Sequence, residues 1–319
     1  MKHRHIPLFT SKVGWLPVFV FIIGAVILMT WWYNAKKNQD ELNRSLVELN
    51  SMTYAQHLQM DIMQGINITN TLKEVIISHD GEMQKFSEIA EGMRTDFIQS
   101  IQIAPNGVVT EIYPSEGNED GKIDLIHDKD RGEISCYARD HGIITIQGPF
   151  PLKQGGSGIA VRNPVYLKDS NGEKKFWGFA IVIIRVPEIF SETIDALSRF
   201  GYDFSFSKTV SPWDPTYQEV YSSGASMKDA ATYDFDLGDS RWKLEVQPKN
   251  GWNDNQRLYL MLACGFLILL LLSGLTAVIL SYHEAKVVET QTTLLNRKLE
   301  KALEQANAAS VAKSRFISS

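Results

Sequence analysis

Two neighbouring stretches decide the fold: IAVRNPVYL at residues 159–167 and FWGFAIVIIRV at residues 176–186. Both are rich in β-branched and aromatic residues, which favour strands. The turn sequence DSNG at residues 169–172 joins them, so the pattern predicts two antiparallel neighbours. The second stretch is nearly continuous in apolar residues, which predicts burial on both faces in the middle of a sheet.

Towards the N-terminus the sequence predicts further strands and then helices. Residues 143–147 form a strand that Gly148 and Pro149 end, and residues 101–113 form a hairpin around a Pro-Asn-Gly turn. Helical periodicity precedes the hairpin at residues 34–63, 66–77 and 83–98, with a break at residues 79–81. Helices followed by an antiparallel sheet predict an α+β domain of PAS type.

The helix at residues 34–63 carries a single apolar seam. It either packs on its own domain or forms a parallel dimer stalk, and the polar Thr53 and Gln56 in the seam leave both open.

Towards the C-terminus the pattern predicts a connecting helix at residues 187–199 and then a second, smaller sheet nearer the membrane. Its strands are expected at residues 202–206, 219–221, 232–237 and 242–247. The last of them leads within a few residues into a long apolar segment, which predicts a short mechanical path to the membrane.

Two uncharged apolar segments, residues 13–33 and 258–281, have the length needed to cross a bilayer. A cleaved signal peptide is the alternative for the first segment. The aromatic triplet at residues 31–33 is typical of a membrane interface, and no small-residue cleavage motif precedes Asn34, so a retained helix is favoured.

Two spans divide the chain into five parts and place both termini on the same side of the cell's inner (plasma) membrane. We expect a cytoplasmic N-terminus at residues 1–12 and an extracytoplasmic sensor at residues 34–257 between the spans. The sensor comprises stalk helices (34–80), a membrane-distal PAS-like core (81–186) and a membrane-proximal subdomain (187–257). Residues 282–319 are a cytoplasmic signalling helix.

The apolar seam of residues 282–319 repeats at spacings of three and four residues, which predicts a parallel two-helix coil and hence a homodimer. The alternative is a single amphipathic helix on the membrane or on another domain. The seam consists of Val288, Thr292, Leu295, Leu299, Ala302, Ala306, Ala309 and Phe316.

The sequence carries no pattern typical of catalysis, metal binding or nucleic-acid binding. The net charge of -5 shows no basic stripe, and Cys136 and Cys264 lie in different parts of the predicted fold, so no disulfide is expected. GGSGI at residues 155–159 lacks the last glycine of a nucleophile elbow. The spacing of His127, Asp128, Asp130 and His141 fits no metal motif. We therefore predict no catalytic, cofactor-binding or metal-binding residue here.

Four motifs together resemble the CHASE sensor domain over residues 86–186: APNGVV, YPSEGNEDGKIDLIHDKDR, GPFPLKQGGSGIAVRNPVY and FWGFAIVII. Such domains lie outside the membrane in bacterial sensor kinases, in nucleotide cyclases and in plant cytokinin receptors. AKSRFISS at residues 312–319 resembles the start of the dimerising helix of histidine kinases, in which the phosphoaccepting histidine follows within a few residues.

The resemblance implies a membrane receptor that passes a small-molecule signal to a sensor histidine kinase in a two-component phosphorelay, with a response regulator as partner. ATP and Mg²⁺ would belong to the kinase part, which these residues do not include. The alternatives are the same sensor coupled to an adenylate, guanylate or diguanylate cyclase, or a membrane adaptor without a kinase.

In PAS-like folds the ligand lies against the central strands, which bounds the expected site by residues 109–115, 146–158 and 159–165. Arg162 is suited to a bidentate grip on a carboxylate or phosphate. The alternative for Arg162 is a structural salt bridge to Asp124 or Asp128. The other candidate ligand-binding residues are Lys153, Tyr113, Ser115, Gly155, Gly156, Ser157 and Ile146, with the glycine turn offering backbone N–H groups.

The resemblance also bears on the ligand. Cytokinin receptors place an acidic residue on the hairpin strand against the purine, where Ser115 stands here, and a threonine where Arg162 stands. Both departures favour a small anionic or zwitterionic ligand over a cytokinin.

Overall fold

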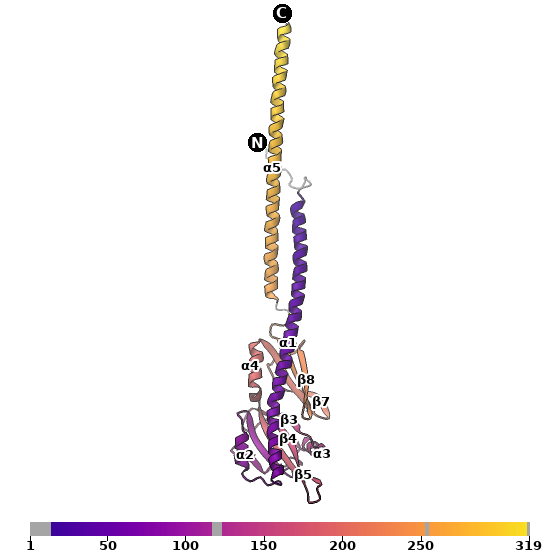
Figure 1. Cartoon of the computed structure of the whole chain (residues 1–319), viewed down its shortest axis with the longest axis vertical. Helices are drawn as coiled ribbons and strands as arrows, with labels where there is room; N and C mark the ends of the chain where they lie inside the picture. The colour runs from indigo at the N-terminus through magenta and orange to yellow at the C-terminus, as the bar shows by residue number, and fades with distance from the viewer. Residues whose placement is uncertain (1–13, 117–122, 253–254, 318–319) are drawn as a thin grey trace. The chain divides into compact units, whose positions relative to one another are not determined.

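The computed structural model describes residues 14–116, 123–252 and 255–317 (Figure 1). The chain forms two units. One comprises the described parts of residues 1–39 and 255–319, and the other comprises residues 40–254.

The first unit consists of the apolar parts of two long helices, α1 (Leu16–Ser78) and α5 (Gln256–Ile317). Their most apolar windows have mean hydropathies of 2.1 and 2.6, and length and composition allow both to cross a membrane. Small residues let the helices approach closely, because a Cβ on Gly24 would lie 2.4 Å from Leu269 and one on Gly265 would lie 2.8 Å from Leu28.

The second unit contains a five-stranded antiparallel sheet in the order β2-β1-β5-β4-β3. The predicted central position of residues 176–186 is confirmed, since β5 lies between β1 and β4. The prediction that residues 148–149 end a strand is wrong: the ladder shifts register between Gln147 and Phe150, and β3 continues to Pro151. The strands are β1 (Ile98–Pro105), β2 (Glu111–Tyr113), β3 (Thr145–Pro151), β4 (Ser157–Lys168) and β5 (Lys174–Val186).

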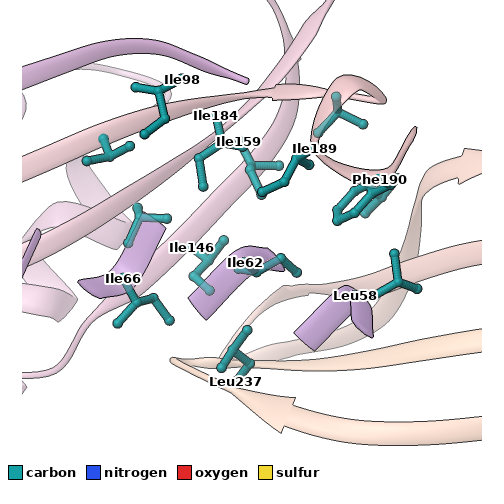
Figure 2. Packing of buried hydrophobic residues seen from close by; sticks show 14 of the residues in the cluster. Leu58, Ile62, Ile66, Ile98, Ile146, Ile159, Ile184, Ile189, Phe190 and Leu237 are labelled. Atoms are coloured by element: carbon teal, nitrogen blue, oxygen red, sulfur yellow. The ribbon is translucent and has the colours of Figure 1, made fainter. Parts of the chain in front are cut away.

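Helix α1 covers one face of this sheet. Figure 2 shows Ile62 and Ile66 of α1 beside Ile146 and Ile184 of the strands, all of them buried. The helix packs so closely that a Cβ on Gly65 would lie 2.3 Å from the end of the Ile184 side chain. The apolar seam predicted for residues 34–63 is a different face of α1: Leu46, Leu49 and Met60 of that seam are exposed.

The other face of the sheet is covered by residues 123–131 and the helix α3 (Gly132–His141). Leu125 and Ala138 from this cover pack on Phe179 and Ile181 of β5 in a second, smaller apolar cluster. Helix α3 is absent from the sequence-based prediction, because its 10 residues contain few large apolar side chains and show no wide apolar stripe.

The helix boundaries differ from the prediction in two places. Residues 66–77 are not a separate helix, because α1 continues through Gly65 and ends only at Ser78. Helix α2 (Phe86–Met93) is shorter than predicted, since the backbone of Arg94 is extended and β1 already begins at Ile98. The predicted break at residues 79–81 is confirmed, and Gly81 has a positive φ of 85° there.

A connecting segment follows β5 and leads to a second sheet, as predicted. The connection comprises the 3₁₀ turn η1 (Glu188–Phe190) and the helix α4 (Ser191–Arg199). The second sheet has the order β7-β6-β9-β8, and its core is aromatic, with the Phe206 and Trp242 ring centroids 5.1 Å apart. Its strands are β6 (Tyr202–Ser211), β7 (Asp214–Ser222), β8 (Ala231–Leu237) and β9 (Ser240–Pro248).

We expect Ile62→Ala to lower the free energy of unfolding by about 2–5 kcal/mol, because Ile62 is fully buried between α1 and the sheet. Chemical unfolding of the full chain in detergent, followed by tryptophan fluorescence, measures the loss. The matched control is Gln64→Ala on the exposed face of the same helix, which we expect to change stability by less than about 0.5 kcal/mol. Equal losses in the two variants would contradict the packing described.

Asp61 makes stability depend on pH. Burial raises its pKa from 3.8 to about 6, the charge of His57 lowers it and the charge of Glu192 raises it. The folded chain therefore holds a proton on Asp61 that the unfolded chain releases between about pH 4 and pH 6. We expect this contribution to stability to be full below pH 4 and to be lost as the pH rises through 6. Asp61→Asn should flatten the profile in that window, and an unchanged profile would contradict the assignment.

Candidate ligand-binding site

A cavity of about 130 Å³ lies between the face of the first sheet that α1 does not cover and the segments over it. The sheet supplies its floor, and residues 123–131 and the loop between β3 and β4 supply its walls. The lining residues are Gln99, Ser100, Gln102, Ile112, Ile123, Leu125, Arg131, Phe150, Pro151, Leu152, Lys153, Gln154, Ala160, Arg162, Ile181 and Ile183.

The strand register explains why these side chains share one face. Arg162 of β4 stands opposite Ile181 of β5, which stands opposite Gln102 of β1, which stands opposite Ile112 of β2. Directly opposed residues in antiparallel strands point to the same face of the sheet. The register thus builds one continuous row across four strands, with the guanidinium of Arg162 at one end.

Arg162 is the chemically distinctive residue of this row. It is only 2% exposed, and its Nε and Nη1 atoms are buried without a hydrogen-bond partner in the described part of the chain. Burial lowers the pKa of Arg162 to about 10, the charge of Arg131 acts in the same direction, and the charges of Asp239 and Asp128 oppose the shift. The side chain therefore carries a full positive charge at neutral pH.

The structural salt bridge considered for Arg162 does not form within the described residues. Asp124 instead accepts from Nδ1 of His127 at 2.8 Å, and Asp128 accepts from Nη1 of Arg131 at 3.1 Å. A buried donor without a partner costs about 1–3 kcal/mol, and more when it is charged. An anion in the cavity would satisfy this need of Arg162, and the planar guanidinium suits a carboxylate in particular.

The loop between β3 and β4 brings only part of the predicted set to the cavity. Lys153 lines the cavity from an exposed position. Gly155 and Gly156 have φ of 88° and 81° and form a tight turn, in which the N–H of Gly155 donates to the carbonyl of Leu152 at 3.0 Å. The N–H of Gly155 is therefore engaged within the turn. Gly155, Gly156 and Ser157 do not line the cavity.

Ile146, Tyr113 and Ser115 also lie away from the cavity. Ile146 stands opposite Val161 and points to α1, where Figure 2 shows it beside Ile62. Tyr113 stands opposite Ile101 and packs on the same core, whereas Ser115 is exposed beyond the end of β2. The ligand-binding assignment of these residues stays a prediction, and the structure places each of them outside the lining.

Ser100, Gln102 and Arg131 line the cavity from outside the three predicted ranges. Gln102 is buried and its Nε2 donates to the Ser100 Oγ at 2.9 Å. Polar side chains at alternating positions of an otherwise apolar strand are a signal that could have revealed this face. Nothing in the local sequence could have revealed Arg131, because the loop that carries it reaches the cavity only through the fold.

In the described part of the chain, no group of three or more His, Cys, Asp or Glu side chains could hold a metal ion. The site offers cations, amides and apolar surface, which suit binding of a small anion.

Comparisons with known proteins give one family match. The model of the family described as "CHASE domain" matches residues 54–216, about half of the chain. The search of curated proteins gives no significant match.

Among solved structures, the chain is similar to an extracellular ligand-binding receptor from Desulfohalobium retbaense, with 12% identity and a TM-score of 0.48 over 63% of this chain. The match spans only 40% of that receptor. The periplasmic sensory domain of the Campylobacter jejuni chemoreceptor Tlp1 has 12% identity and a TM-score of 0.46, covering 67% of this chain and 98% of that one. The Vibrio cholerae LuxQ periplasmic domain has 15% identity and a TM-score of 0.31, covering 65% and 96%.

We expect Arg162→Met to raise the free energy of unfolding in the absence of ligand by about 1–3 kcal/mol, because it removes a buried charge with two unpartnered donors and keeps most of the side-chain volume. Urea unfolding of the full chain in detergent measures the change. The control is Arg185→Met, whose half-buried guanidinium is 3.0 Å from Glu188 and whose loss should be neutral or slightly destabilising. If Arg162→Met destabilised the chain more than Arg185→Met, a structural role for Arg162 would follow.

Proposed function

The chain belongs to the CHASE-domain family of extracytoplasmic sensor domains, and from this premise we propose that it is the sensory part of a membrane receptor for a small anionic ligand. The observation that carries the proposal is the buried guanidinium of Arg162, whose Nε and Nη1 have no partner in the described part of the chain and whose side chain lines a cavity. Charges buried in a protein need a partner. In a sensor domain, the ligand is the natural partner.

The rest of the lining indicates the kind of anion. Arg131 and Lys153 add positive charge around the cavity, while Ile112, Ile181 and Ile183 supply apolar surface. A carboxylate on a short carbon skeleton fits both the positive charge and the apolar surface. The guanidinium would bind the carboxylate, and the isoleucines would pack on the carbon atoms. The side-chain amides of the lining glutamines could hydrogen-bond a further polar group of the ligand. A zwitterionic ligand therefore also fits the cavity.

We propose that the sensor lies outside the cell membrane and that both termini lie in the cytoplasm. The apolar segments at residues 13–33 and 258–281 would be the two spans, with residues 34–257 between them as the sensor. Support comes from the length and hydropathy of these segments and from the position of the family match between them.

The proposed output is a histidine kinase acting on a response regulator. Residues 282–319 would form a parallel coiled coil in a homodimer and carry the signal onward. This part of α5 exposes Val288, Leu295 and Leu299 at 60%, 67% and 65%, as a helix awaiting a partner does. The resemblance of residues 312–319 to the dimerising helix of histidine kinases favours this output over a cyclase.

The test is isothermal titration of the full chain in nanodiscs with acetate, propionate, succinate and benzoate, each compared with its neutral amide. We expect at least one carboxylate to bind, its amide not to bind, and Arg162→Met to weaken binding by at least about 30-fold, because a buried charged pair is broken. Arg185→Met, outside the cavity lining, should leave the affinity unchanged.

Absence of binding by any carboxylate, or binding that is indifferent to Arg162→Met, would overturn the proposal. Binding of an adenine-type cytokinin by both the wild type and Arg162→Met would assign the cavity to a neutral purine instead.

A further inference from the structure

The floor of the cavity changes its chemistry from strand to strand. Strand β4 supplies a guanidinium and a methyl group, β5 supplies two isoleucines, and β1 supplies an amide and a hydroxyl. Opposed residues share a face of the sheet, so these side chains form two parallel rows across the floor. The rows consist of Arg162, Ile181 and Gln102 in one and Ala160, Ile183 and Ser100 in the other, and all six residues line the cavity.

The polar end of the floor is a pair of buried side chains on β1. The Nε2 atom of Gln102 donates to the Oγ of Ser100 at 2.9 Å, and both residues are buried. Within the described residues, the side-chain amide of Gln102 makes no other hydrogen bond. A primary amide offers a second N–H donor and an acceptor oxygen. Gln102 can therefore pair with a ligand group that has both an acceptor and a donor.

The charges around the cavity indicate that this ligand group is neutral. Arg162, Arg131 and Lys153 line the cavity, whereas none of the described aspartates and glutamates does. An ammonium group near Gln102 would lose its hydration in a cavity that offers cations and no carboxylate. A charge that loses water without gaining a counter-charge is strongly unfavourable. A neutral polar group avoids this cost, because hydrogen bonds to Gln102 replace those to water.

The distance between the two polar ends limits the length of the ligand. Gln102 and Arg162 lie on strands that are separated only by β5. Neighbouring strands are about 4.8 Å apart and side chains stand roughly perpendicular to the sheet, so the two ends are roughly 10 Å apart. A hydrogen bond of about 3 Å at each end leaves roughly 4 Å for the part of the ligand between them. That is the reach of a short carbon chain, which would lie over Ile181 and Ile183.

We propose that Gln102 determines the specificity of the cavity, and that the ligand is a short-chain carboxylate whose far end is a neutral group with a donor and an acceptor, such as a carboxamide. The inference rests on the proposed function, since it assumes that the carboxylate binds at Arg162. It deepens that function, because a carboxylate with an apolar or an ammonium end would satisfy Arg162 equally well.

Three carboxylates that differ at the far end test the inference in the wild-type chain. Succinamate ends in a carboxamide, isocaproate has methyl groups in place of the amide nitrogen and oxygen, and γ-aminobutyrate ends in an ammonium group. In isothermal titration of the full chain in nanodiscs, we expect succinamate to bind about tenfold more tightly than isocaproate, which is the scale of one or two neutral hydrogen bonds. We expect γ-aminobutyrate to bind at least about tenfold more weakly than succinamate, because its charge finds no partner.

Gln102→Met assigns the preference to one residue, since it removes the amide and keeps most of the side-chain volume. We expect this variant to bind succinamate about tenfold more weakly than the wild type does, and to bind isocaproate with the wild-type affinity or slightly more tightly. Isocaproate binding thus reports that the cavity is intact. The matched control is Gln64→Met on the exposed face of α1, which should leave both affinities unchanged.

The outcomes separate the inference from the proposed function. If succinamate and isocaproate bind equally well and both require Arg162, the inference is overturned and the proposed function stands. The same holds if γ-aminobutyrate binds most tightly, or if Gln102→Met keeps the preference for succinamate. If none of the three binds, or if their binding is indifferent to Arg162→Met, the proposed function fails and the inference fails with it. The wild-type comparison decides these cases even if Gln102→Met does not fold.

Discussion

The two-residue alternation of β4 is the constraint on which the site depends. Alternate side chains of a strand point to opposite faces of the sheet. Val161 therefore packs in the core beneath α1, and Arg162 points to the opposite face. Both faces are covered, one by α1 and the other by residues 123–131 and α3. The guanidinium of Arg162 therefore cannot extend into bulk water. Its surroundings are the side chains of this covered face and of the segments that lie over it.

That environment explains how an arginine is tolerated in the middle of a buried sheet. The cavity leaves space beside the guanidinium, amide and hydroxyl side chains share its face, and Asp239 supplies a distant negative charge. These features keep Arg162 charged without satisfying its donors. A site that holds a charged group ready for a ligand gives up stability in the unliganded state, which is a common cost of binding sites.

The same sheet has a different role on each face. On the α1 face, close aliphatic packing around Ile62 and Gly65 joins the sheet to a helix that also contains an apolar, membrane-length segment. At the edge strand β3, the β8–β9 turn binds the backbone N–H of Ile146, the neighbour of Thr145, which stands opposite Arg162. The first sheet thus contacts the second sheet through β3, and the last strand of the second sheet precedes α5 in the chain.

Local patterns in the sequence determined most of the element types, the central place of residues 176–186 and the α+β class, and they singled out Arg162 as a candidate ligand-binding residue. Apolar periodicity, turn residues and an arginine inside an apolar strand are all visible within a few residues. Helix α3 was missed. Tertiary structure alone decided which side chains share the cavity. The register places Ile112 rather than its neighbour Tyr113 in the row of Arg162, since a shift of one residue moves a side chain to the other face. It also brought Arg131 and Asp239 towards Arg162 from loops far away in the sequence, where no local pattern reports the distance between charges.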